Sequence, residues 1–254
     1  MSSIYMYHGV GNDEQTEGSD PHYRVTEETF LRHLSLIKNS VSIERQFADS
    51  KSINTHAITF DDGHISNYEV AFPLLLEKRM TADFYVNSDS IGTKNYISWP
   101  QLKEMAQAGM SIQSHGHEHK YISDLSEQEI TKQLDYSKKL IEDKLGNSVF
   151  VFAPPGGRYD DRVVEISKSL GYKLISSSIP GVVPKSKSFI LPRFAVTHNT
   201  SDSKISNWQN RLSLNSIFEV SKYQILKNAK KVFGNKSYEK VRAILLRDNQ
   251  EWKQ

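Results

Sequence analysis

The chain has 254 residues, and its 32 basic and 30 acidic side chains leave a net charge of only +2. It therefore lacks the global positive field that holds proteins on nucleic acid, and we expect no nucleic-acid partner. The absence of cysteine excludes disulfides, thiolate zinc sites and a cysteine nucleophile, so any metal must be bound by His, Asp or Glu. The length and the 37% content of hydrophobic residues suit one large domain with a buried core.

Short apolar runs alternate with helical patterns through most of the chain. In chain order, the expected strands cover 57–60, 82–87, 110–113, 149–153 and 173–177. The expected helices cover 68–78, a segment opened by Ser98, the range 126–145, which begins with a capping box at Ser126, and 160–170, which Gly171 closes. This alternation predicts an α/β fold with parallel strands, crossover helices and reactive groups at the carboxyl ends of the strands.

After Asn199 the pattern is helical only, with helices expected at 217–233 and 238–246. We therefore divide the chain into a main domain over 1–200 and a helical, basic extension over 201–254. A solvated basic face on packed helices is the favoured interpretation of the extension. The alternative is a basic amphipathic helix that makes peripheral contact with an anionic membrane surface.

The amino-terminal sequence indicates the compartment. Its first residues, MSSIYMYHGVGND, lack the basic start and apolar stretch of a secretory signal, and no apolar run approaches a membrane span. These features predict a cytoplasmic protein. If the basic extension touches a membrane, the protein lies peripherally at the inner face.

Two adjacent carboxylates, Asp61 and Asp62, follow the strand at 57–60 and precede a glycine. A turn can aim both into one pocket, where a metal takes one carboxylate and leaves the other as a base. An ordinary Asp-Asp-Gly turn is the alternative interpretation.

Three histidines in five positions follow the strand at 110–113, in the segment His115-Gly116-His117-Glu118-His119. A spacing of four places His115 and His119 on one side of a helical turn, where both imidazoles can share one divalent ion. Together with Asp62 they make a two-His-one-carboxylate site with open positions for water and substrate. Such a site suits metal-assisted hydrolysis.

With these motifs the chain resembles the NodB-type polysaccharide deacetylases of carbohydrate esterase family four. The resemblance covers roughly 53–178 and rests on Thr59-Phe60-Asp61-Asp62-Gly63, on the histidine segment and on Phe152-Ala153-Pro154-Pro155-Gly156-Gly157, in that order. It implies a distorted (β/α) barrel over 1–200 and metal-dependent removal of an acetyl group from an N-acetylated sugar.

The resemblance also implies roles for particular residues. Asp61 is the expected general base, and Asp62, His115 and His119 are the expected ligands of a divalent metal, with Zn²⁺ favoured. In the third motif, a backbone N–H near Gly156 is expected to stabilise the oxyanion together with the metal.

Two departures from the family pattern concern the third motif. The arginine that normally begins it, and that orients the catalytic aspartate, is replaced by Ala153. Arg158 and Arg193 are the candidates for its role, and we favour Arg193. The aromatic residue usual before the second glycine is also missing, because Gly156 stands there.

The general acid has two candidates. His198 lies late in the chain, where many relatives carry this histidine. His8 lies in a Tyr-His opening that resembles the biofilm-polysaccharide branch of the family, whose motif order is permuted. We predict that His8 is the acid.

These inferences favour a deacetylase that modifies a nucleotide-, lipid- or polymer-linked sugar, a precursor of a surface polysaccharide or glycolipid. The alternatives are a deformylase or other amide hydrolase on the same fold, and a non-catalytic carbohydrate-binding relative. A purely structural protein that works through its basic extension leaves the three motifs unexplained. For sugar stacking, the candidates are Tyr85, Trp99, Tyr121 and Tyr159, although aromatics beside strands more often serve packing.

Overall fold

The structure is a computed structural model, and it describes residues 2–50, 53–184, 186, 188–210, 213–214 and 216–225. Eight strands form one sheet in which all neighbouring strands are parallel, in the order β7-β6-β5-β4-β3-β2-β1-β8. The strands are β1 (Ile4–Tyr7), β2 (Ala57–Phe60), β3 (Ala82–Val86), β4 (Ser111–Ser114), β5 (Val151–Phe152), β6 (Leu174–Ser176), β7 (Ile190–Leu191) and β8 (Phe194–Ala195).

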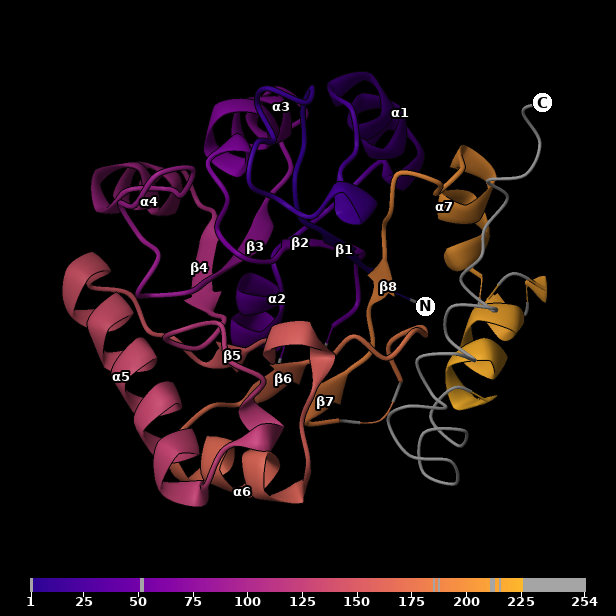
Figure 1. Cartoon of the computed structure of the whole chain (residues 1–254). Coiled ribbons are helices and arrows are strands. Elements are labelled where there is room, and N and C mark those ends of the chain that lie inside the picture. Colours follow the sequence, from indigo (N-terminus) through magenta and orange to yellow (C-terminus); the bar gives the residue numbers. More distant parts are fainter. Residues whose placement is uncertain are drawn as a thin grey trace, which may run out of the picture.

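Helices surround the curled sheet (Figure 1). They are α1 (Glu27–Ile37), α2 (Ile43–Ser50), α3 (Phe72–Glu77), α4 (Trp99–Gln107), α5 (Glu127–Leu145), α6 (Asp161–Ser169) and α7 (Asp202–Trp208). A short π-helical turn at Asn67–Ala71 leads into α3. The predicted α/β alternation and the barrel architecture are therefore confirmed.

One stretch of chain supplies both edges of the sheet. Only Pro192 and Arg193 separate β7, which pairs with β6, from β8, which pairs with β1. The chain thus passes from one edge of the sheet to the other at this point. The edge strands β7 and β8 are not neighbours in the sheet, and Arg193 lies at the gap of the distorted barrel between them.

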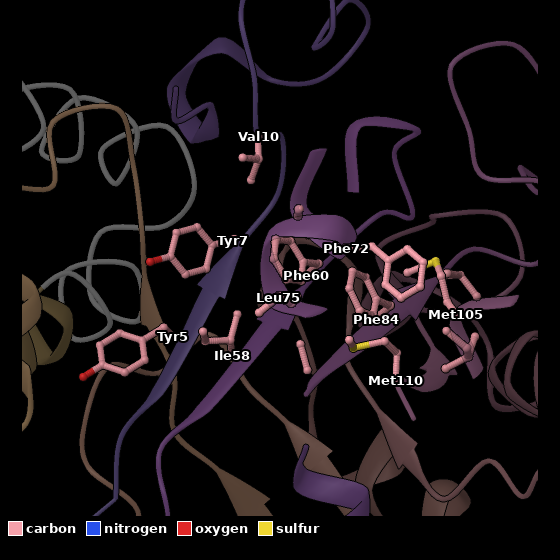
Figure 2. Close-up of a cluster of buried hydrophobic side chains, with 14 of the residues drawn as sticks. Tyr5, Tyr7, Val10, Ile58, Phe60, Phe72, Leu75, Phe84, Met105 and Met110 are labelled. Carbon is pink, nitrogen blue, oxygen red and sulfur yellow. The ribbon is translucent and has the colours of Figure 1, made fainter. Parts of the chain in front are cut away.

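Side chains along each strand alternate between two cores, as expected for a strand covered on both faces. Tyr5, Phe60 and Phe84 belong to the large cluster between the sheet and the helices, drawn in Figure 2. A second cluster contains Ala57 and Tyr85. On β2 the positions of Ala57, Thr59 and Asp61 share one face, so Asp61 continues the row that lines the inside of the barrel.

The carboxyl-terminal part is described only as far as residue 225. Helix α7 packs against α1, and its Trp208 ring stacks on Phe194 at a centroid distance of 4.8 Å. Residues 216–225 are helical, in agreement with the start of the helix expected at 217–233. The helix expected at 238–246 lies outside the described residues. Among those described, no helix has both the length and the apolar character that a bilayer crossing requires.

Candidate active site

The polar residues singled out in the sequence meet at the carboxyl ends of β1, β2, β4 and β5. His8 follows β1, Asp61 follows β2 and His115 follows β4. Backbone hydrogen bonds beyond the strand ends hold these positions in register. The N–H of Asp61 donates to the Tyr7 carbonyl at 3.0 Å, and the N–H of His115 donates to the Val86 carbonyl at 2.9 Å. The strand framework therefore places the reactive groups at one end of the barrel.

Asp62, His115 and His119 offer ligand atoms that all lie within 4.8 Å of one another. The Nε2 atoms of His115 and His119 are 3.3 and 3.2 Å from Oδ1 of Asp62. Three donors of this kind around one point are typical of a zinc site with open positions.

The local backbone of this group is not helical, and the helical turn predicted for His115 and His119 is wrong. Gly116 has φ 82° and His119 has φ 48°, so the chain enters the left-handed region twice within one loop. Asp62 is also left-handed, at φ 74°, which turns its side chain away from the strand alternation that governs Asp61. The loop, not a helix, brings the two imidazoles together.

A backbone contact orients His115 for metal binding. Its Nδ1–H donates to the carbonyl of Ala153 at 2.8 Å, which turns the Nε2 atom toward Asp62. Such a carbonyl partner is common behind metal-bound histidines, where it sets the tautomer and the ring orientation. The residues present therefore fit a divalent cation, which the two imidazole Nε2 atoms and the Asp62 carboxylate would hold between them.

Electrostatics keep both aspartates ionised. Burial acts to raise the pKa of Asp62, but hydrogen bonds from His115 and His119 outweigh it and hold the pKa well below its ordinary value. For Asp61, burial is likewise outweighed, here by the charge of Arg193, and its pKa is also lowered. The pKa of His119 is raised by its hydrogen bond to Asp62.

Arg193 contacts Asp61 through both of its terminal nitrogens. Nη1 donates to Oδ1 at 2.6 Å and Nη2 to Oδ2 at 2.8 Å, and the guanidinium is fully buried. Nη1 also donates to Thr59 Oγ1 at 3.1 Å and Nε to the Ser177 carbonyl at 2.9 Å. The centroid of the Tyr85 ring lies 5.2 Å from the guanidinium carbon of Arg193. Arg158, the other candidate, instead pairs with Asp124 at 3.6 Å.

The two candidate acids lie in different places. His8 is close enough to Asp61 and Asp62 to lower the pKa of both carboxyls. Its ring stacks on Tyr23 at 4.5 Å. His198 is exposed and donates from Nδ1 to the carbonyl of His22 at 3.1 Å.

Some contacts at the site were missed in the sequence. Tyr23 is fifteen residues from His8 and carries no motif, and the carbonyl of Ser177 has no signature in the sequence. Tyr85, a candidate for sugar stacking, is fully buried beneath Arg193 and is closed to a substrate. One feature of the sequence could have predicted this burial. Apolar residues alternate along β3, and this alternation places Tyr85 on the inner face of the sheet.

Comparison with known proteins identifies the family. The model of the polysaccharide deacetylase family matches residues 48–175, and the chain belongs to this family. A Bacillus subtilis (strain 168) protein, YxkH, whose name classes it with the polysaccharide deacetylases, is 28% identical over 210 residues, which are 79% of this chain and 73% of the relative. The poly-beta-1,6-N-acetyl-D-glucosamine N-deacetylase of Staphylococcus aureus (strain MRSA252) is 27% identical over 166 residues, 59% of this chain and 57% of the relative.

Solved structures show the same fold. The Streptococcus pyogenes deacetylase PplD in complex with acetate superposes with a TM-score of 0.73 at 26% identity, covering 82% of this chain and 97% of that one. IcaB from Ammonifex degensii superposes with a TM-score of 0.71 at 22% identity over 82% of this chain and 96% of that one. The distorted barrel predicted from the motifs is thus confirmed.

Proposed function

We propose that the chain is a metal-dependent N-deacetylase that removes the acetyl group from an N-acetylated amino sugar of a surface polysaccharide or glycolipid precursor. The observation that carries this proposal is the group formed by Asp62, His115 and His119 beside Asp61, a carboxylate held ionised by Arg193. A divalent ion held there, with Zn²⁺ favoured, supplies Lewis acidity toward water and the amide carbonyl.

Asp61 acts as the general base in this proposal. Its lowered pKa keeps it ionised at neutral pH, and the two-pronged contact with Arg193 fixes the plane of the carboxylate. Each carboxylate oxygen has two acceptor sites. The contact with Arg193 therefore leaves Asp61 able to accept a proton from the attacking water. A fixed base within hydrogen-bond reach of that water is what proton abstraction requires.

His8 is proposed as the general acid, because it is close enough to both aspartates to lower their pKa values, whereas the exposed His198 contacts the carbonyl of His22. It donates the proton that the departing amine needs when the tetrahedral intermediate collapses. The backbone N–H at Gly156 is proposed to donate to the developing oxyanion.

The family and the poly-N-acetylglucosamine relatives support an N-acetylated glycan as substrate, without fixing its linkage or carrier. Removal of a different acyl group, such as formyl, by the same residues is the second candidate, because they act on the amide carbonyl and not on the methyl group. The cytoplasmic location and the peripheral membrane contact stay predictions.

The proposal is tested by measuring bound metal and acetate release on the same purified protein. Substrates are N-acetylated nucleotide sugars and oligomers of N-acetylglucosamine, with N-formyl analogues alongside. We expect one bound metal per chain and acetate release that Asp61→Asn lowers by about 10²–10⁴-fold, the usual contribution of a general base. Asp62→Ala should lose the metal.

His117→Ala is the matched control. His117 lies in the same loop, but its Nδ1 shares a hydrogen bond with Ser88 Oγ, 2.9 Å away, and not with Asp62. It should keep both metal and activity. Metal that binds equally well to the Asp62→Ala variant would contradict the site. Release of formate without acetate would favour the second candidate, and bound metal without any acyl release would favour the carbohydrate-binding alternative.

A further inference from the structure

Tyr121 lies at the rim of the candidate active site with 45% of its surface exposed. It belongs to the loop between β4 and α5 and comes two residues after His119. The same loop lies against the segment after β5, where the carbonyl of Ala153 holds His115. A large aromatic side chain left open to solvent at this point calls for an explanation.

The ring of Tyr121 occupies the space next to Gly156. A Cβ atom built on Gly156 would lie 2.5 Å from Cε1 and 3.1 Å from Cδ1 of Tyr121, closer than atoms approach without moving. Gly156 also has φ 60°, a left-handed conformation that favours glycine. A side chain at 156 and the present position of the Tyr121 ring are therefore mutually exclusive.

Arg158 fixes the ring from a second side. Its guanidinium carbon lies 3.9 Å from the centroid of the Tyr121 ring, the distance of a stacked cation–π contact. Asp124 Oδ2 lies 3.6 Å from Nη1 of Arg158 and restrains the guanidinium in turn. With one ring face covered by Arg158 and Gly156 beside the ring, the solvent-exposed part of the ring is available to a ligand.

We propose that Tyr121 is a substrate-binding residue on which a pyranose ring of the glycan stacks, with Arg158 as its support. An aromatic ring offers an apolar face to the C–H groups of a sugar, and the planar guanidinium carries several donors for sugar hydroxyl and carbonyl oxygens. The ring is held in place before binding, so little conformational entropy is lost when a sugar docks. This inference rests on the proposed function and names the residue that recognises its substrate class.

Tyr136 supplies a comparison within the chain. It is 50% exposed, on α5, and its ring contacts His117 at 4.5 Å. It thus matches Tyr121 in type and exposure, but its ring packs on His117 and not on Gly156 and Arg158. Loss of Tyr136 should leave sugar binding unchanged.

The test is a calorimetric titration of the full chain with a β-1,6-linked tetrasaccharide of N-acetylglucosamine, with Asp61→Asn as the common background to stop turnover. Tyr121→Ser should weaken binding about five- to tenfold, in line with the strength of specific aromatic contacts. Tyr121→Phe keeps the ring and should bind as the parent does, as should Tyr136→Ser. Circular dichroism checks folding, and Tyr121→Leu replaces the Ser variant if that variant does not fold.

Equal affinity in the parent and in the Ser or Leu variant overturns the inference, as does the absence of tetrasaccharide binding in the parent. An equal loss in Tyr136→Ser overturns it too, because the effect would then not belong to this place. Acetate release by the native chain, measured separately, distinguishes the two proposals. Tyr121-dependent binding without any acetate release would refute the deacetylase while the sugar-binding role stands.

Discussion

At the residue scale, the decisive feature is a buried ion pair between Asp61 and Arg193. The guanidinium is fully buried, both carboxylate oxygens are bonded, and Thr59 and Ser177 accept the remaining hydrogen bonds described above. Buried charges persist in proteins when they are paired and hydrogen-bonded in this way. The pair holds a base in a fixed orientation at the mouth of the barrel.

We expect Arg193→Met to lower kcat/KM and to destabilise the fold, because Asp61 is left as an unpaired buried charge. Losing one partner of such a pair typically costs about 3–5 kcal/mol. The pKa of Asp61 should rise, since the Arg193 charge now lowers it, so the acidic limb of the pH profile of kcat/KM should move to higher pH.

Arg193→Lys is the matched variant, because it keeps the charge but loses the planar fork. It should recover much of the stability and leave the acidic limb near its original position, while kcat stays reduced. Steady-state kinetics across pH and urea unfolding measure both properties. An unshifted acidic limb in Arg193→Met would show that Arg193 does not set the pKa of Asp61.

At the element scale, helix α2 is tied to β3 through Asp83. The carboxylate accepts hydrogen bonds from the backbone N–H groups of Ile43 at 2.6 Å and Glu44 at 3.3 Å. Burial is the largest influence on this group and outweighs those hydrogen bonds, raising the pKa of Asp83 to about 7. Asp83 lies near the amino end of its strand, away from the candidate active site.

A pH dependence of stability follows from Asp83. Because its pKa in the folded chain is above the ordinary 3.8, its contribution to the free energy of unfolding is complete below about pH 4 and is lost as the pH rises through about 7. Asp61 and Asp62 have lowered pKa values, so their contributions are lost only at more acidic pH. The pH range over which Asp83 loses its contribution therefore does not overlap the more acidic range over which Asp61 and Asp62 lose theirs.

Urea unfolding between pH 5 and pH 8 tests this prediction. The native chain should lose stability relative to Asp83→Asn as the pH rises, by an amount of the order of a few kcal/mol in total, since each unit of pKa shift corresponds to about 1.4 kcal/mol. Parallel pH curves for the two proteins would contradict the raised pKa.

At the scale of the whole molecule, the core between the sheet and the helices sets the stability of the barrel. Phe60 and Phe84 stack at its centre with ring centroids 4.7 Å apart and planes at 6°, and both are fully buried (Figure 2). Phe60 immediately precedes Asp61. Strand β2 therefore holds a core side chain on its outer face, and the proposed base follows on its inner face.

Phe84→Ala should lower the free energy of unfolding by about 3–5 kcal/mol, because it removes buried apolar area and leaves a cavity. Tyr136→Ala, at a half-exposed position, should change it by less than about 0.5 kcal/mol. Chemical denaturation of both variants measures the difference. A small effect of Phe84→Ala would mean that the core repacks around the gap.

Much of the fold was predictable because its signals are local. The strands at 57–60 and 82–87 and the helix at 126–145 were found from apolar runs and a capping box, and they agree with β2, β3 and α5. The strands β7 and β8 were not predicted, because Pro192 and Arg193 interrupt the apolar run in which both lie, whereas the equally short β5 lies in the uninterrupted apolar run 149–153. The π-helical turn before α3 also went unseen, since its hydrogen-bond pattern has no residue signature.

The sequence alone determined the residue types of the candidate site, because Asp-Asp-Gly, the clustered histidines and the Pro-Pro-Gly-Gly segment are contiguous and each follows a strand. Only the tertiary structure decided which distant residues join them. Arg193 reaches Asp61 because the chain crosses the gap of the barrel there, and Tyr121 lies beside Gly156 because two loops meet. Such contacts join residues far apart in the chain, and they depend on strand order and barrel closure, which no local pattern encodes.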